Sequence, residues 1–573
     1  MLPRFVLRLC LVFFVVGLRA QTVAPVASFV GGVWSGNVTA TSASVVVRLS
    51  AAAQKTRLVV SQNLNLSSPI YSSAVNTSAA AGNTVTLTAQ GLKADTDYFY
   101  GVEVAGVLRS DEQSRGRFRT FPLGRGSFKI AFGSCGDFRA ADQSAYDAIL
   151  RERPLLFINT GDLHYVDTNT TNADDYRANY DSVLSQSNQS ALYRGVPVAY
   201  MWDDHDFCGD GTDTTAIGRD TARAVYKERV PHYPIASAGG TIAQAFTIGR
   251  VRVLMTDLRS AAVSPYQKES AAKTRMGTAQ KTWFKQELIN ARDAGFPLII
   301  WVCPDPWIGP AAVGDDTWAG HATERIELAN FIRDNRITNL VLLAGDMHGL
   351  AADDGTNSDY ATGGGAPLTV LHGAALTSPP SEKGGPYSGG VLPGSQQFGI
   401  LEIYDSGGPS VACRYLGVRA GEGVKLTHIF SGSPAGSKGL GLVNISTLAR
   451  VTADQPAIVS GFVISGAVNR TVLVRAIGPT LAAFGVDNVL ARPVLSVFQG
   501  EREIATNEGW GQSIDSGVQL TAAFDRAGAF RLLDETSRDA SLVLSLEPGA
   551  YTVQVKSGDT KTGAALLEVY DLP

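Results

Sequence analysis

Four short apolar runs, each ending in side chains that bind metals, constrain this 573-residue chain more than any other feature. The runs are Phe128 to Cys135, Leu155 to Tyr165, Val196 to Asp206 and Leu340 to His348. Apolar runs of this length, bounded by Gly and polar residues, predict strands that are buried on both faces. Ligands of open α/β sheets bind beyond the carboxyl ends of such strands. We therefore expect the four ends to meet in one site.

The chain is too long for one hydrophobic core, so several domains are expected. Residues 22–122 carry short strand patterns with turn signals, which predict a β-sandwich. Residues 127–430 alternate strand and helix patterns, as in a layered α/β domain. Residues 431–441 have the composition of a Gly/Ser linker, and residues 442–573 return to the short strands of a second β-sandwich. The predicted fold is a central α/β sandwich with a β-sandwich on either side.

Residues 1–20 have the pattern of a secretory signal, with Arg4 and Arg8 before an apolar stretch and the small Ala20 at the cleavage position. A membrane anchor is the alternative, but the apolar stretch is too short to span a bilayer. No later stretch is long and apolar enough either, so we expect a secreted, periplasmic or cell-surface protein without a transmembrane segment. The net charge of −4 gives no electrostatic basis for specific nucleic-acid binding.

The side chains at the four strand ends form a donor set for metals. Thiolate and phenolate donate charge strongly, whereas carboxylates also suit hard cations. Asp162 and Asp346 share the spelling Gly-Asp-x-His, in which Gly permits a tight turn beside a cation. One carboxylate that bridges two metals holds them about 3.5–4 Å apart, which suits phosphoryl transfer. Solvated turn aspartates and a buried apolar thiol at Cys135 are the structural alternatives.

The chain resembles the PhoD-type alkaline phosphatase/phosphodiesterases, within the calcineurin-like metallophosphoesterases, over about residues 22–430. The resemblance rests on the order of four motifs: Gly133-Ser-Cys135, Gly161-Asp162-x-x-Tyr165, Trp202-Asp203-Asp204-His205 and Gly345-Asp346-x-His348. Secondary matches are Asp257-Leu-Arg259-Ser260, the segment Met276 to Trp283 and the segment Asp316 to Arg325. The run from Gly91 to Val104 is similar to fibronectin type III-like modules, which agrees with an N-terminal sandwich.

The resemblance implies a site with two metals. Around a ferric ion it places five ligands: Cys135, Asp162, Tyr165, Asp346 and His348. Asp204 would hold a second metal, suggested to be calcium, with Asp162 as the bridge. Ligand type alone does not exclude zinc or other divalent metals.

The resemblance also implies roles for residues that do not bind metal. His205 would stabilise the transition state or protonate the leaving oxygen, and Arg259 would clamp phosphate through its planar donor fork. Four more residues are expected around the ligands: His164, Asp203, Asp206 and His321. His321 stands where relatives usually have Tyr, and Asp206 where many have Glu. Arg4 and Arg8 are separated where exported relatives often have adjacent arginines.

The predicted function is an exported, metal-dependent phosphoric ester hydrolase that scavenges phosphate. In it a hydroxide or oxo group activated by two metals would attack phosphorus. Small phosphomonoesters and phosphodiesters are the expected substrates, with cell-surface polymers and phospholipids as further options. Two alternatives stay open: a hydrolase that uses Cys135 as nucleophile with a histidine base, and a catalytically silent surface-binding protein.

Overall fold

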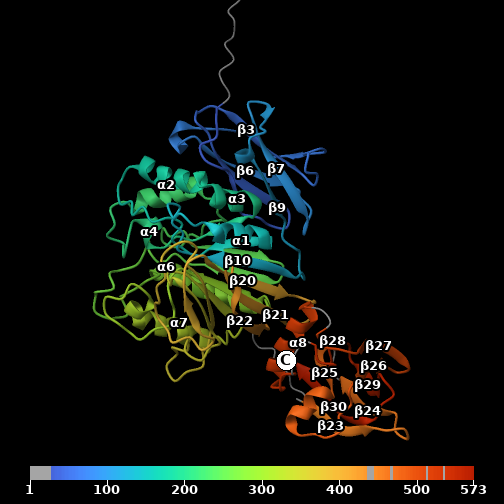
Figure 1. The fold of residues 1–573 in the computed structure, drawn as a ribbon. Helices are drawn as coiled ribbons and strands as arrows, with labels where there is room; N and C mark the ends of the chain where they lie inside the picture. Colours follow the sequence, from blue (N-terminus) through green and yellow to red (C-terminus); the bar gives the residue numbers. More distant parts are fainter. Residues whose placement is uncertain (1–26, 435–443, 465–468, 512–513, 533–535, 573) are drawn as a thin grey trace, which may run out of the picture.

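The computed structural model describes residues 27–434, 444–464, 469–511, 514–532 and 536–572 (Figure 1). The predicted signal, residues 1–20, and most of the predicted linker lie outside this part of the chain. Within it, no helix has the length and apolar character needed to cross a membrane.

Two large sheets form the centre of the molecule (Figure 1). The first has nine strands in the order β22 (Gly423–Gly432), β21 (Val411–Arg419), β20 (Gln397–Tyr404), β10 (Phe128–Gly133), β11 (Leu156–Asn159), β12 (Val198–Tyr200), β1 (Trp34–Gly36), β2 (Ser42–Arg48) and β6 (Thr84–Gln90). The second has seven, in the order β13 (Gln244–Ile248), β14 (Val251–Met255), β15 (Leu298–Cys303), β16 (Leu340–Ala344), β18 (Thr369–Gly373), β17 (Gly349–Asp353) and β19 (Val391–Pro393). The strands predicted from the four apolar runs are confirmed as β10, β11, β12 and β16.

Alternation along the strands explains why the apolar runs are continuous. In β16, Val341 and Leu343 join the core between the sheets, whereas Leu340 and Leu342 join a second core on the other face. A strand covered on both faces has no position for a polar side chain. Strands β10, β11 and β12 are parallel to one another, as are β14, β15, β16 and β18, so within each set the carboxyl ends lie at one edge.

Helices cover the outer faces of both sheets. The helices beside the nine-stranded sheet are α1 (Ser144–Glu152), α2 (Ala173–Ser185), α3 (Ser187–Gly195) and α5 (Arg219–Arg229), and those over the seven-stranded sheet are α6 (Thr278–Asp293) and α7 (Ala322–Asp334). A single turn, α4 (Asp204–Phe207), follows β12. These layers bury both sheets and leave their strand ends free to carry a site.

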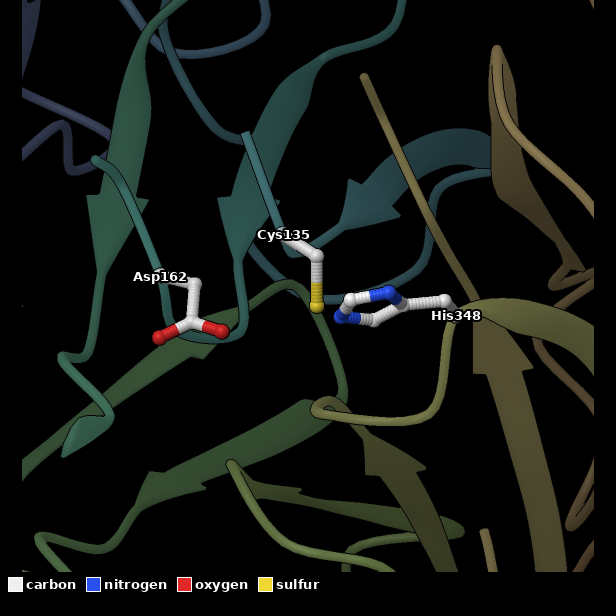
Figure 2. Close-up of side chains that lie close together, drawn as sticks. All are labelled: Cys135, Asp162 and His348. Carbon is white, nitrogen blue, oxygen red and sulfur yellow. The ribbon is translucent and has the colours of Figure 1, made fainter. Parts of the chain in front are cut away.

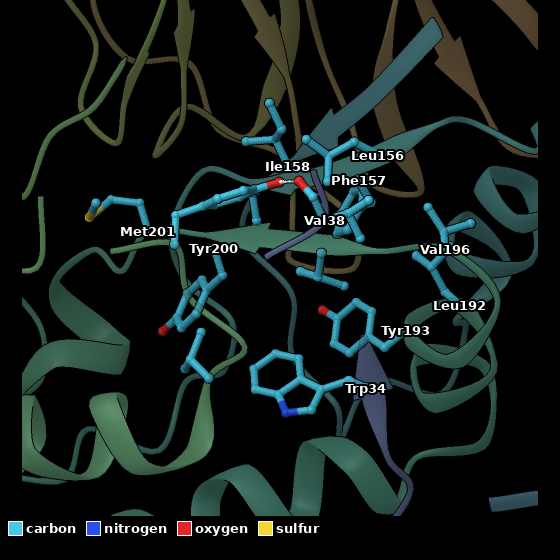
Figure 3. Close-up of a cluster of buried hydrophobic side chains, with 14 of the residues drawn as sticks. Trp34, Val38, Leu156, Phe157, Ile158, Leu192, Tyr193, Val196, Tyr200 and Met201 are labelled. Atoms are coloured by element: carbon cyan, nitrogen blue, oxygen red, sulfur yellow. Dashed lines mark hydrogen bonds between the residues drawn. The ribbon is translucent and has the colours of Figure 1, made fainter. Parts of the chain in front are cut away.

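The N-terminal sandwich shares a sheet with the central region, which differs from the flanking module expected at 22–122. Its second sheet contains β3 (Lys55–Ser61), β4 (Ile70–Tyr71), β5 (Val75–Asn76), β7 (Asp97–Val104), β8 (Val107–Leu108) and β9 (Arg115–Arg119), but its first is completed by β12 of the central region. Gly36 pairs with Val198 across this junction, where a Cβ on Gly36 would lie 2.5 Å from the Val198 oxygen. Figure 3 shows Trp34 near Tyr193, and their stacked rings are 5.7 Å apart. One hydrophobic core therefore spans both regions.

The C-terminal region is a β-sandwich with its own core. One sheet has the strand order β23 (Asn444–Val451), β30 (Gly563–Leu572), β25 (Arg470–Ile477) and β28 (Ala540–Leu546). The other has the order β24 (Ala457–Ile464), β29 (Gly549–Ser557), β26 (Pro493–Gln499) and β27 (Arg502–Asn507), and the two enclose one core. Helix α8 (Ile514–Ala527), which the sequence pattern did not predict, packs Ala522 against Tyr404 and Ala412. β22 continues to Gly432, so the predicted linker begins two residues too early.

Candidate metal centre

Three predicted ligands follow strand ends in the left-handed backbone conformation. Cys135 (φ 61°) follows β10, Asp162 (φ 54°) follows β11 and Asp346 (φ 61°) follows β16. This conformation costs a non-Gly residue about 1–2 kcal/mol, so it persists where the surrounding structure imposes it, as functional sites do. Gly161, before Asp162, has φ 117°, and a Cβ there would lie 2.7 Å from the Asp203 Cβ. The turns place donor atoms of Cys135 and of Asp346 each within 4.8 Å of an Asp162 oxygen.

Cys135, Asp162 and His348 each offer a donor atom within 4.8 Å of the others (Figure 2). The Cys135 side chain is buried, and burial, followed by the charge of Asp346, raises the pKa of its thiol to about 12. At neutral pH the thiol is therefore protonated unless a cation lies beside it. A bound metal removes this proton readily, because coordination strongly stabilises a thiolate.

Asp162 belongs to two further donor groups of the same dimensions. One contains Asp204 and His205, and the other contains Asp203 and Asp346. Burial, followed by the charge of Cys135, raises the pKa of Asp162 well above its usual range. A carboxylate shared by every donor group has the position required of a bridging ligand.

Tyr165 adds a phenol oxygen beside the first group. The Tyr165 hydroxyl donates to Asp162 Oδ2 at 2.9 Å and lies 3.2 Å from His348 Nε2. His348 Nδ1 donates to the Pro379 carbonyl at 2.6 Å, which leaves the Nε2 lone pair facing the group. Burial lowers the pKa of His348 and raises that of Tyr165. A neutral imidazole whose other nitrogen is fixed by a carbonyl is the usual form of a metal-binding histidine.

The donor set fits a cation. Asp162 Oδ1 and Asp203 Oδ2 are buried without a hydrogen-bond partner in the described part of the chain. No Lys or Arg of that part forms an ion pair with Asp162, whereas Lys383 pairs with Asp346. Buried carboxylates are costly unless a positive charge compensates them. A positive ion among these oxygens would satisfy the two orphaned acceptors.

Asp204 and His205 lie in α4, whose first turn is fixed by a capping box between Asp203 and Asp206. Asp204 accepts from the Gly211 N–H at 2.8 Å. Burial opposes its ionisation, but Arg259 lowers the pKa of Asp204 below its usual value. Asp204 is thus a carboxylate in the absence of any metal.

His205 pairs with Asp167, a residue that the sequence analysis missed. His205 Nδ1 lies 2.6 Å from Asp167 Oδ1, and its ring centroid is 4.1 Å from that of Tyr165. Asp167 follows Asp162 closely in the chain, but its left-handed turn (φ 57°), which brings it to His205, has no Gly to signal it. The pair orients the imidazole with Nε2 available for proton transfer.

Arg259 lies in different surroundings from those expected of a phosphate clamp. Its Nε donates to Asp203 Oδ1 at 2.6 Å, and its two terminal nitrogens donate to Asp316 Oδ2 at 2.6 Å and Asp305 Oδ1 at 3.2 Å. Its side chain is 1% exposed. Because every nitrogen is engaged by a carboxylate, the guanidinium is not open to a substrate in this structure. Arg259 thus compensates the charge of these three aspartates, which we call the acidic wall behind the site.

The remaining expected residues lie around the site in different ways. Asp206 accepts from the Leu163 N–H at 2.7 Å, which fixes the chain next to Asp162, and burial raises its pKa to about 6. His164 is buried, which lowers its pKa to about 3. His321 ends the 3-10 turn Trp318–His321 and contacts the Val263 carbonyl at 3.0 Å. Neither histidine belongs to a donor group among the described residues.

Two face-packed sheets with metal-type donors at their strand ends define the class of this chain, an α/β sandwich that carries a candidate metal centre. The family model "PhoD-like phosphatase" matches residues 130–388, and "PhoD-like phosphatase, N-terminal domain" matches residues 18–122. The chain belongs to the PhoD-like phosphatase family, as its motifs predicted.

Individual relatives agree with this assignment. Alkaline phosphatase D of Bacillus subtilis (strain 168) is 23% identical over 314 residues, which cover 46% of this chain and 53% of that protein. The match thus spans about half the length of the curated relative. A solved structure of PhoD superposes with a TM-score of 0.59 at 17% identity, over 71% of this chain and 90% of that one. The two chains therefore share a fold.

Proposed function

We propose that this chain is a metal-dependent phosphoric ester hydrolase of the alkaline phosphatase D type. The observation that carries the proposal is that Asp162 is common to all three donor groups, with the His205–Asp167 pair beside them. A shared carboxylate suits two metals, and a histidine with one nitrogen held by a carboxylate suits proton transfer to a leaving group.

The proposed ligands are those expected from the sequence. Cys135, Tyr165, Asp346 and His348 would hold an iron ion, Asp204 would hold a calcium ion, and Asp162 would bridge them. When bound, the two ions would lower the pKa of water and offset the charge that develops on phosphorus. Thiolate and phenolate suit a trivalent, electron-poor ion, and oxygen donors suit calcium.

His205 would act on the leaving group. Its Nδ1–H is held by Asp167 Oδ1, so Nε2 can carry the proton that passes to the departing alkoxide oxygen. The carboxylate of Asp167 would stabilise the imidazolium before this transfer, and the ring of Tyr165 would keep the imidazole from turning. Proton transfer by a positioned side chain typically contributes 10²–10⁴-fold to a rate.

Substrate range and location form part of the proposal. Small phosphomonoesters and phosphodiesters are the proposed substrates, and extracellular polymers or phospholipids remain further options. The signal-like residues 1–20 support export, and an exported phosphatase would release phosphate for uptake. The alternative with a Cys135 nucleophile is disfavoured, because reactive thiols have lowered pKa values and partial exposure, whereas Cys135 is buried with a raised pKa.

Elemental analysis of the purified protein, paired with hydrolysis of a chromogenic monoester and diester, tests the proposal. We expect iron and calcium near one each, and loss of both metal and turnover in Asp162→Ala and Cys135→Ala. Cys413→Ala is the matched control, because Cys413 is also a buried free thiol but lies in β21. Protein that neither binds metal nor turns over esters after both ions are supplied would instead support the silent surface-binding protein.

A further inference from the structure

The segment from Thr377 to Lys383, which we call the ligand strap, contacts several proposed ligands. The backbone N–H groups of Thr377 and Ser378 both donate to the Cys135 carbonyl at 3.2 Å. The strap follows β18 of the seven-stranded sheet, whereas Cys135 follows β10 of the nine-stranded sheet. These bonds fix the near end of the strap to the strand-end turn that carries Cys135.

The far end of the strap is fixed to the Asp346–His348 turn. Ser381 N–H donates to the His348 carbonyl at 3.3 Å, and the Pro379 carbonyl accepts from His348 Nδ1. Lys383 then forms an ion pair with Asp346 Oδ1. The strap is thus built onto the donor groups themselves, and it places an ammonium group within them.

Lys383 differs from the other cations of this region in its exposure. Its side chain is 44% exposed, whereas Arg259 and Arg275 are each 1% exposed and engaged by buried aspartates. Arg139 is a second exposed cation at the site, but it makes two bonds to the Asp137 carboxylate, at 2.9 and 3.0 Å, and donates to the Tyr165 carbonyl at 2.8 Å. Lys383 therefore combines access to solvent with an ion pair to the carboxylate of a proposed ligand, whereas Arg139 contacts only the backbone of one.

The ammonium and a metal ion would compete for the same carboxylate. Asp346 forms a donor group with Asp162 and Asp203, so a cation held there lies close to the oxygen that Lys383 contacts. Two like charges at this separation repel strongly. The Lys383 stem is long and flexible and its side chain is 44% exposed, so the ammonium can turn toward solvent.

We propose that Lys383 is a substrate-binding residue that changes partner: it neutralises Asp346 before metal binds, and afterwards its ammonium binds a non-bridging phosphoryl oxygen. This inference rests on the proposed function, because it needs a phosphate ester beside the metals. A lysine is suited to the role as a compact point charge for phosphate. It also supplies the free cation that Arg259, held by three aspartates, does not.

The test compares full-length wild type with Lys383→Met and Lys383→Arg in two calorimetric titrations. Zn²⁺ titrated into metal-free protein should bind roughly three- to tenfold more tightly to Lys383→Met, because the competing charge is gone. Inorganic phosphate titrated into protein loaded with iron and calcium should bind that variant roughly 10- to 100-fold more weakly. Lys383→Arg should recover phosphate binding to within about tenfold of wild type. Lys129→Met is the control and should bind phosphate as wild type does, because Lys129 pairs with Glu152 at 2.7 Å and contacts no donor group. Arg139→Gln tests the other exposed cation at the site.

Opposite changes in the two affinities separate this role from a structural one, which would weaken both. Unchanged phosphate affinity in Lys383→Met, or a loss in Arg139→Gln instead, overturns the assignment of Lys383 while wild-type metal binding and turnover still support the hydrolase. Wild type that binds no metal and hydrolyses no ester overturns both proposals. If Lys383→Met does not fold, as judged by its melting temperature without metal, Lys383→Gln supplies the same comparison.

Discussion

Replacement of Arg259 by Met would test how much the acidic wall behind the site depends on one buried cation. The Arg259 and Asp203 side chains are 1% and 0% exposed and pair at 2.6 Å. Arg275 still pairs with Asp305 and Asp316 after the substitution, so the loss falls on Asp203 and on Asp204, whose Oδ2 lies 3.8 Å from the guanidinium. Removal of one partner of a buried ion pair costs about 3–5 kcal/mol, because the remaining charge is left uncompensated. We expect the free energy of unfolding to fall by this amount.

Urea unfolding of the metal-free protein measures the effect as a lower midpoint at constant slope. Arg119→Met is the matched control, since Arg119 and Asp95 form a pair with half-exposed side chains, and its loss should cost less than about 1 kcal/mol. Addition of Asp203→Asn to Arg259→Met should restore part of the stability, because it removes the orphaned charge. A change below about 1 kcal/mol in Arg259→Met would refute the reasoning and indicate that Asp203 is protonated in the native state.

Three further outcomes are expected. Gly161→Ala should lower the free energy of unfolding by about 2–5 kcal/mol and reduce the metal content, since its Cβ would lie 2.7 Å from the buried Asp203 Cβ. Gly91→Ala, whose Cβ would meet no atom within 4 Å, is the control and should lower it by only about 1–2 kcal/mol in chemical denaturation. Asp167→Asn should lower kcat about 10- to 100-fold with unchanged metal content if Asp167 orients His205, and unchanged kcat would contradict that role. His372 is buried, which lowers its pKa to about 3. The unfolded chain therefore binds a proton at His372 below pH 6.5 that the native chain does not, so between pH 6.5 and 5 the free energy of unfolding of metal-free wild type should fall by about 2 kcal/mol more than that of His372→Gln.

The central fold could be predicted because its strands are buried on both faces. Apolar runs that end at Gly and polar residues have few other structures available, and the four predicted strands are present as β10, β11, β12 and β16. Helix α8 could not be predicted in the same way. It contains Gly517 and Thr521, which are weak helix formers, and its position against β21 and β22 is a matter of tertiary packing.

In the candidate site, too, the residues at strand ends could be predicted and those in irregular segments could not. The proposed ligands converge because each one follows a strand end, and parallel strands bring those ends together. Lys383 and Asp167 could not be assigned because their partners depend on the path of irregular segments, which no periodic pattern encodes. Arg259 was identified as important, but its role depends on Asp305, which is 46 positions away. Sequence order does not show which of two anions, a carboxylate or a phosphate, a buried guanidinium binds.

Because β1 pairs with β12, the N-terminal sandwich is not an independent domain that can be removed without exposing the central sheet. Trp34 donates its ring N–H to the Arg229 carbonyl at 2.8 Å, and Arg194 reaches back to Glu112 at 2.7 Å. In a shortened chain that began at the central region, β12 would be an unpaired, apolar edge strand. Such edges promote aggregation. Substitutions at this junction must suit both regions, because one hydrophobic core contains residues of each.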